Sequence, residues 1–139
     1  MLQSIAVITL GVADLARTRR FYVEGFGWTP VFENPEIAFY QMNGLVLGTW
    51  LEGALAADMQ RAAAGPGAYA LAHNVARQED VAPAMESLVR AGGRLLRAAV
   101  APPHGGLSGY VEDPDGHAWE IAWNPAWRIG PDGRVIFGV

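Results

Sequence analysis

The order of secondary-structure signals repeats once along this chain, and the repetition constrains the fold more than any other feature. Each half opens with a β-rich apolar run, at 4–12 and at 68–75. Each run is followed by an amphipathic helical pattern that ends at glycines, and then by three strand patterns separated by turn residues. The chain therefore predicts two βαβββ units in tandem.

The first half shows these signals in turn. Asp14 occupies the position of a helix cap, and it precedes apolar residues at helical spacing, namely Leu15, Tyr22, Val23 and Phe26. Gly25 and Gly27 end the helical pattern. Asn43-Gly44 is a strong hairpin signal, and strands are expected near 28–33, 36–42 and 45–51.

The second half follows the same order. Glu79-Asp80 open a helix that ends at Gly92-Gly93, and its apolar stripe consists of Val81, Met85, Leu88 and Val89. Asp115-Gly116 turn the last hairpin. Strands are expected near 94–100, 107–112 and 117–123.

These elements predict one α+β domain, 1–139, in which two βαβββ repeats form a cup-shaped, eight-stranded mixed sheet. The repeats span 4–52 and 67–125, with a linker at 53–66 and a C-terminal tail at 126–139 that contains a further Pro-Asp-Gly turn. In each unit the helix covers one sheet face and leaves the other open, so the open faces are expected to line a pocket. Because the edges of such a sheet often pair between copies, we expect a homodimer.

Composition excludes several classes of partner. The formal net charge is −4 and the ten Lys+Arg residues are dispersed, which argues against a nucleic-acid partner. The chain has no Cys, which excludes disulfides, thiolate metal sites and a Cys nucleophile. Neither a signal peptide nor a membrane-spanning apolar run is evident, so a cytoplasmic protein without a membrane partner is expected.

Two segments now carry a resemblance to a known family. The segments are GVADLARTRRFYVEGFGW at 11–28 and GYVEDPDGHAWEIAWNP at 109–125, and with the order of elements they resemble the vicinal oxygen chelate superfamily. That superfamily includes glyoxalase I, fosfomycin-resistance enzymes, extradiol dioxygenases and bleomycin-binding proteins. The resemblance covers 4–125 and implies the tandem glyoxalase/bleomycin resistance-like fold. Shorter runs (LAHNV at 71–75, HGGLSGY at 104–110 and WEIAWNPAW at 119–127) are similar to a bacterial subgroup known only as glyoxalase- or bleomycin-resistance-like.

Most enzymes of that superfamily hold a divalent metal at equivalent points of the two repeats. The resemblance places one of these points at Glu120, four residues after the DPDG turn, and matching the repeats gives Gly48 as its equivalent. The resemblance also implies a ligand five residues before Val12 and Val75, the matching ends of the first strands, which gives Val7 and Ala70. Of the four side chains only Glu120 can coordinate a cation, whereas catalytic divalent sites need about three protein ligands. We therefore expect no metal and no other cofactor.

The three histidines offer little support for a rebuilt metal site. Strand parity turns His73 and His117 away from the face that carries Glu120, so His73 is expected to be a hydrogen-bonded structural residue and His117 structural or exposed. His104 lies in the loop APPHGGLSG, where glycine freedom can bring a side chain over a pocket mouth. Both an exposed loop position and a ligand contact stay open for His104.

Parity predicts a cup of small residues with a flat aromatic surface and sparse polar anchors. The expected ligand-binding residues are Thr9, Trp50, Asn74, His104, Tyr110 and Glu120. The favoured hypothesis is a metal-free protein that sequesters a planar or partly apolar compound, such as an antibiotic. The alternative is a lyase, isomerase or natural-product tailoring enzyme with Glu120 as general base or in a non-standard metal site. A dimeric domain without a small-molecule role is the third possibility.

Overall fold

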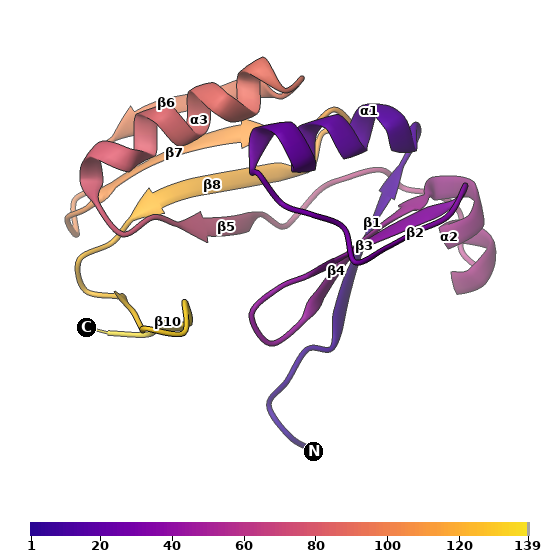
Figure 1. The fold of residues 1–139 in the computed structure, drawn as a ribbon, viewed down its shortest axis with the longest axis horizontal. Coiled ribbons are helices and arrows are strands. Elements are labelled where there is room, and N and C mark those ends of the chain that lie inside the picture. Colours follow the sequence, from indigo (N-terminus) through magenta and orange to yellow (C-terminus); the bar gives the residue numbers. More distant parts are fainter. Residues whose placement is uncertain (139) are drawn as a thin grey trace.

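The computed structural model describes residues 1–138 and contains two βαβββ repeats (Figure 1). Val139, the last residue of the predicted tail, lies outside the described residues. The first repeat consists of β1 (Val7–Val12), α1 (Leu15–Arg20), the π-helical turn η1 (Phe21–Gly25), β2 (Phe32–Glu33), β3 (Ile37–Gln41) and β4 (Val46–Leu51). Helix α2 (Glu52–Met59) follows it. The second repeat consists of β5 (Leu71–Asn74), the 3₁₀ turn η2 (Gln78–Asp80), α3 (Val81–Arg90), β6 (Arg94–Val100), β7 (Leu107–Glu112) and β8 (Ala118–Trp123).

Strands β1, β2 and β5 differ most from the expected ranges, and each is several residues shorter than the sequence indicates. Strand β1 begins at Val7, β5 begins at Leu71, and β2 contains only Phe32–Glu33. Before β2 the extended run is broken because Gly27 has a positive φ of 77° and Pro30 has no N–H to donate to a neighbouring strand. The tail forms a further small hairpin, as predicted, from β9 (Arg128–Ile129) and β10 (Val135–Ile136).

The eight strands of the repeats are divided between two four-stranded mixed sheets with the same order, β1-β4-β3-β2 and β5-β8-β7-β6. In each sheet the first pair is parallel and the others are antiparallel. Thr9 faces Gly48 in the first sheet, and Ala72 faces Glu120 in the second. These registers confirm that Gly48 and Glu120 occupy equivalent positions of the duplication.

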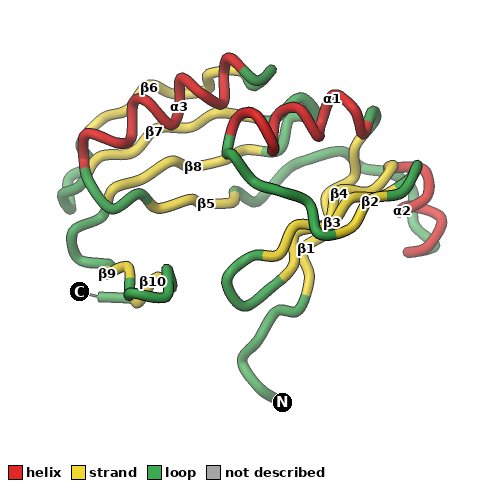
Figure 2. Tube along the Cα trace, viewed as in Figure 1, coloured by secondary structure: helices red, strands yellow, loops and turns green. Residues whose placement is uncertain are grey.

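The helices of both repeats lie on the same side of the molecule, with α1 and α3 next to each other above the strands (Figure 2). Residues Val81, Met85 and Leu88 of α3 are buried, as their spacing predicts. Val89, which the same stripe included, is instead 40% exposed. Val89 follows Val81 by eight residues. Because an α-helix turns about 100° per residue, the Val89 side chain points about 80° away from that of Val81 and lies outside the buried stripe.

A single hydrophobic core joins the two repeats. From the first repeat it contains fully buried aromatic side chains, among them Phe21, Tyr22 and Tyr40. From the second it contains the buried face of α3 together with Val111, Trp119 and Ile121. The face of each sheet opposite these helices is called the open face below.

The Asp-Pro-Asp-Gly turn before β8 forms hydrogen bonds that connect the second repeat to the first. One carboxylate oxygen of Asp115 accepts hydrogen bonds from the Ala13 N–H at 2.8 Å and from the Arg17 guanidinium at 3.0 Å. The other accepts from the Thr18 hydroxyl at 2.8 Å. Because Thr18 is fully buried and the Asp115 side chain nearly so, the bond between these two is shielded from water, whereas the Arg17 guanidinium is half exposed.

Asp113 extends the same junction into the core. Its carboxylate accepts from the Tyr22 hydroxyl at 2.7 Å and from the backbone N–H groups of Asp115 and His117 at 2.9 Å. Burial raises the pKa of Asp113, and its hydrogen bonds oppose the increase. Burial, then the nearby charge of Asp113, raise the pKa of Tyr22 well above its ordinary value.

His117 is buried at this junction and has a structural role. Its Nε2 lies 2.8 Å from the carbonyl oxygen of Gly11, which can only accept, so Nε2 carries the proton. Nδ1 is then the acceptor for the Tyr69 hydroxyl. Of the two predicted environments, the structural one is confirmed and the exposed one is wrong.

His73 lies on the helix side of β5, as strand parity predicts. Its ring meets those of Phe26 and Trp28 edge to face, at centroid distances of 5.6 and 6.1 Å. Burial among these apolar groups lowers the pKa of His73. The helix-side position of His73 is confirmed, but its ring forms aromatic contacts and no hydrogen bond within residues 1–138, contrary to the expected hydrogen-bonded role.

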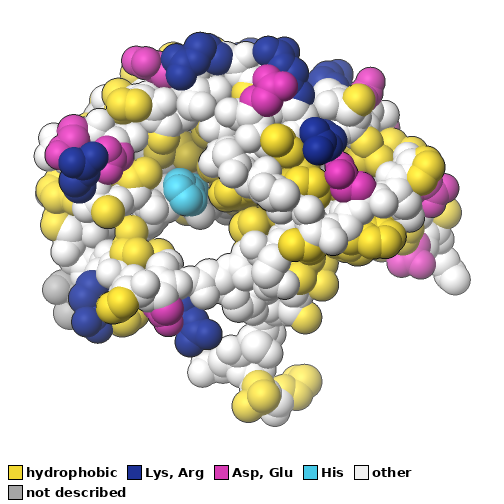
Figure 3. All heavy atoms as spheres, in the orientation of Figure 1, with side chains coloured by type: hydrophobic (Ala, Val, Ile, Leu, Met, Phe, Trp, Pro, Cys, Tyr) yellow, Lys and Arg dark blue, Asp and Glu magenta, His cyan; other side chains and the backbone are white. Residues whose placement is uncertain are grey.

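No helix among residues 1–138 has the length and apolar character needed to cross a membrane. On the face shown in Figure 3, basic and acidic side chains are interspersed over the helices. A hollow opens between the tail and the first repeat, and hydrophobic side chains border it.

Candidate functional site

A cavity of about 340 Å³ opens on the second sheet and brings together three of the predicted ligand residues, Asn74, His104 and Glu120. Asn74 comes from the end of β5, Glu120 from the middle of β8, and His104 from the loop between β6 and β7. Trp123 and Trp127 add aromatic surface. The cavity therefore combines an acid, an imidazole and an amide with apolar walls, the usual character of a small-molecule site.

Small neighbours give Glu120 its access to this cavity. Ala72 faces it across the parallel pair, and Ala122 lies two residues further along β8 on the same face. Glu120 is partly buried and forms no ion pair with any residue from 1 to 138. Its negative charge is therefore not matched by a cationic side chain in the part of the chain that the structure describes.

The β6–β7 loop reaches the cavity because of two glycines. Gly105 and Gly106 have φ angles of 91° and 90°, a region that other residues rarely adopt. A Cβ on Gly106 would lie only 2.5 Å from the carbonyl oxygen of Trp123. Glycine thus lets the loop lie against the end of β8, and this close approach brings His104 to the cavity.

Tyr110, another predicted ligand residue, lies next to Glu120 on the adjacent strand β7. On its other side, the Arg97 guanidinium lies over the Tyr110 ring, 5.1 Å from the centroid. Burial and then the negative charge of Glu120 raise the pKa of Tyr110, while Arg97 opposes them. Tyr110 thus separates a cationic from an anionic side chain on the open face.

A β-bulge directs Arg97 to this face. Leu95 faces Val111 but Arg97 faces Tyr110, so β6 advances two residues while β7 advances one. A regular strand would place Leu96 opposite Tyr110 and turn Arg97 to the helix side. Bulges commonly redirect a side chain in this way beside functional sites.

Thr9, also predicted to bind a ligand, lies in a different cavity, of about 230 Å³, over the first sheet. Helix α2, the linker and the His117 turn surround this second cavity, and Tyr69 forms part of its wall. The two cavities have no lining residue in common. The open faces therefore do not bring all the predicted residues into one pocket within the described chain.

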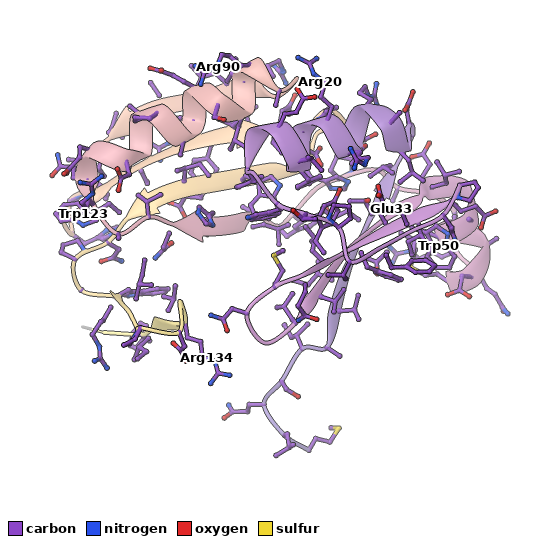
Figure 4. All side chains as sticks on the ribbon, in the orientation of Figure 1. Arg20, Glu33, Trp50, Arg90, Trp123 and Arg134 are labelled. Carbon is purple, nitrogen blue, oxygen red and sulfur yellow. The ribbon has the colours of Figure 1, made fainter. Side chains whose placement is uncertain are left out.

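Trp50, the predicted stacking surface, borders neither cavity in the part of the chain that the structure describes. It lies near α2, toward the opposite end of the molecule from Trp123 (Figure 4). Its ring is partly buried, and its indole N–H is buried without a hydrogen-bond partner among residues 1–138. Residues 9 and 50 are thus separated from the Glu120 cavity.

Comparisons with known proteins match this architecture. The model of the glyoxalase/bleomycin resistance protein/dioxygenase superfamily matches residues 4–121. The chain belongs to this superfamily. None of the curated proteins compared with it matches.

A glyoxalase-related enzyme from Fulvimarina pelagi shares 64% identity with this superfamily member over 99% of this chain and 100% of its own, with a TM-score of 0.98. A lactoylglutathione lyase from Agrobacterium tumefaciens shares 20% identity over 91% and 98% of the two chains, with a TM-score of 0.72. A fosfomycin resistance protein from Mesorhizobium loti shares 18% identity over 89% and 94%, with a TM-score of 0.67. The last two likenesses show the fold alone.

The residues present do not fit the metal that many glyoxalase-superfamily enzymes bind. Of the four positions that the resemblance indicates, Val7, Gly48 and Ala70 offer no side-chain donor. A Cβ on Gly48 would lie 3.1 Å from the Phe39 ring, so an aromatic side chain already fills the place of a ligand there. No cluster of three or more His, Asp or Glu side chains suited to a metal occurs among residues 1–138.

The sequence did not identify Arg97 or Ser108 as site residues of this glyoxalase-superfamily chain. Ser108 faces Ala122 and borders the cavity, so alternation along β7 was a signal that would have found it. Alternation along β6 assigns Arg97 to the wrong face, because the bulge interrupts it. Trp127 borders the cavity with 38% of its surface exposed.

Proposed function

We propose that this protein binds a small, planar or partly apolar molecule through a cationic or hydrogen-donating group held by Glu120, without a metal. The observation that carries the proposal is the position of Glu120. It is a partly buried carboxylate without an ion-pair partner among residues 1–138, in a cavity with Asn74, His104 and two Trp side chains. A ligand cation supplies the opposite charge that the protein does not.

Sequestration of a toxic compound such as an antibiotic is the role that fits best. Binding alone needs shape, apolar walls and a few polar anchors, and the cavity offers these. In this proposal the protein acts in the cytoplasm as a homodimer. Exposed apolar side chains on the first sheet, including Val7 and Phe32, support contact with a second copy.

The test compares benzamidine, a planar cation, with benzamide, its neutral analogue, by quenching of tryptophan fluorescence. We expect benzamidine to bind roughly tenfold more tightly because it forms a charge-assisted hydrogen bond with Glu120. Glu120→Gln removes this preference. Glu112→Gln is the matched control, since Glu112 is a carboxylate of the neighbouring strand that pairs with Arg94 instead.

Equal affinity of the wild-type protein for both compounds would contradict the proposal, as would an unchanged preference in Glu120→Gln. Binding is measured before and after dialysis against a chelator. We expect the two affinities to agree, because the residues do not form a metal site.

A second candidate function is acid–base catalysis. Its specific support is that Glu120 and His104 border the same cavity, where a carboxylate can remove a proton and an imidazole can return one. The 64% identical relative is described as a glyoxalase-related enzyme, which agrees with this reading. Deuterium exchange at the carbon next to the carbonyl of hydroxyacetone, followed by NMR, tests it. Exchange above the buffer rate that Glu120→Gln abolishes supports catalysis, and exchange at the buffer rate argues against it.

A further inference from the structure

The row of facing residues that contains Glu120 has a counterpart in the first sheet. Across the second sheet the row consists of Arg97, Tyr110, Glu120 and Ala72. Across the first sheet the equivalent row consists of Phe32, Phe39, Gly48 and Thr9. The two rows share a geometry but not a chemistry, because only the second contains charged side chains.

In the first row the space is filled by aromatic packing. The rings of Phe32 and Phe39 are 5.9 Å apart, and Phe39 covers Gly48. In the second row Arg97 takes the place of Phe32, and it reaches this place through the β6 bulge. A cation on one side of Tyr110 and an anion on the other is therefore a feature of the second repeat alone.

The guanidinium of Arg97 is held in place but not neutralised. It donates to the backbone oxygen of Ser108 at 3.0 Å, to the Ser108 hydroxyl at 3.1 Å and to the Ala98 carbonyl at 3.3 Å. A guanidinium has five N–H donors, so two remain for a ligand. No carboxylate among residues 1–138 lies within ion-pair distance of it.

Arg97 is also close to the cavity. Ser108, to which it is hydrogen-bonded, borders the same cavity as Glu120. Two strand spacings separate the backbones of Arg97 and Glu120, which is about 10 Å. Partial burial of a charge without a partner costs desolvation free energy. A ligand with an opposite charge for Arg97 and another for Glu120 offsets this cost at both residues.

We propose that the ligand of this cavity carries a negative group in addition to its positive one, with the anion bound by Arg97 and the cation by Glu120. The inference rests on the proposed function and narrows its ligand to a compact zwitterion whose charges are separated by a rigid, planar spacer. Tyr110 lies between the two binding groups and keeps them from pairing with each other.

The test adds a carboxylate to the same probe. 4-Carboxybenzamidine is a zwitterion with one aromatic ring between its charges, and benzamidine is the matched cation. We expect the wild-type protein to bind the zwitterion roughly tenfold more tightly than benzamidine. Arg97→Gln abolishes this advantage, so that the variant binds the zwitterion no more tightly than benzamidine.

Two further variants separate charge from folding. Arg94→Gln is the control, because Arg94 lies on the same strand but pairs with Glu112, and it should keep the preference for the zwitterion. Arg97→Lys keeps the charge but loses the guanidinium fork, so it should show an intermediate preference. The thermal midpoint of each variant shows whether it is folded, and the comparison of the two probes on the wild-type protein does not depend on any variant.

The outcomes distinguish this inference from the function on which it rests. If benzamidine requires Glu120 but the zwitterion binds no more tightly, the Arg97 inference is wrong and the proposed function stands. The same holds if Arg97→Gln keeps the preference for the zwitterion. If wild type and Glu120→Gln bind benzamidine equally, both proposals are wrong.

Discussion

His73, His104 and His117 lie in three different environments. His117 accepts and donates one hydrogen bond each within the junction of the repeats. His73 has aromatic neighbours on the helix side, and His104 is exposed at the cavity mouth. Strand parity was enough to separate His73 from the open face, whereas the position of His104 depends on the conformation of a glycine loop.

The lowered pKa of His73 predicts that stability depends on pH. Its proton binds less tightly in the folded than in the unfolded chain, so the stabilisation is complete above about pH 6.5 and is lost as the pH falls through and below that value. Urea unfolding at pH 7.5 and pH 5 measures the loss. We expect His73→Leu to lose less stability over this interval than the wild-type protein.

His104→Leu is the control for this experiment, because His104 is exposed. It should show the same loss of stability as the wild-type protein. An equal loss in His73→Leu would mean that His73 does not contribute to the pH dependence.

At the scale of elements, the chain contains two Pro-Asp-Gly turns with different roles. In the turn before β8, Asp115 accepts three hydrogen bonds from the first repeat, and its side chain is 7% exposed. In the tail turn, the Asp132 carboxylate accepts from the nearby Arg134 N–H and its side chain is 58% exposed, while only its backbone carbonyl accepts from the first repeat among residues 1–138, from the Asn43 side-chain amide. The local sequence is the same, so burial and long-range partners decide what each turn contributes.

Replacement of each Asp in turn tests this difference. Asp115→Ala leaves the Ala13 N–H and the buried Thr18 hydroxyl without their acceptor, so we expect a loss of about 2–4 kcal/mol in the free energy of unfolding. Asp132→Ala should cost less than about 1 kcal/mol. Urea denaturation at pH 7 measures both, and similar losses for the two variants would show that the first turn does not fasten the repeats.

The sequence predicted the positions of some strand residues and not of others. Hairpin signals and the internal repeat placed Glu120 opposite small residues and made it equivalent to Gly48, and the registers confirm this. Arg97 could not be placed, because the bulge depends on how β6 pairs with β7 and leaves no mark in the apolar pattern. The sequence left Trp50 between core packing and ligand contact, because it could not show that helix α2 covers that end of the first sheet.

At the scale of the whole molecule, the repeats have separate sheets but a common core. Buried residues of α3 contact the η1 segment of the first repeat, and Trp119 of β8 donates a hydrogen bond to the Tyr22 hydroxyl. Neither half can bury its helix face without the other. The two repeats therefore form one structural unit. Their open faces nevertheless differ, because the first has aromatic side chains where the second has charged ones.

This common core predicts that the chain unfolds in one step. Tryptophan fluorescence and far-ultraviolet circular dichroism should give coincident urea transitions, because both repeats lose the core together. Fragments 1–64 and 65–139, divided within the exposed linker, should be unfolded alone and regain the native signals when mixed. A fragment 65–139 with its own cooperative transition would contradict the prediction. It would mean that α3 and the second sheet form a stable core without the first repeat. The contacts of Tyr22 and Asp115 would then join two repeats that fold independently.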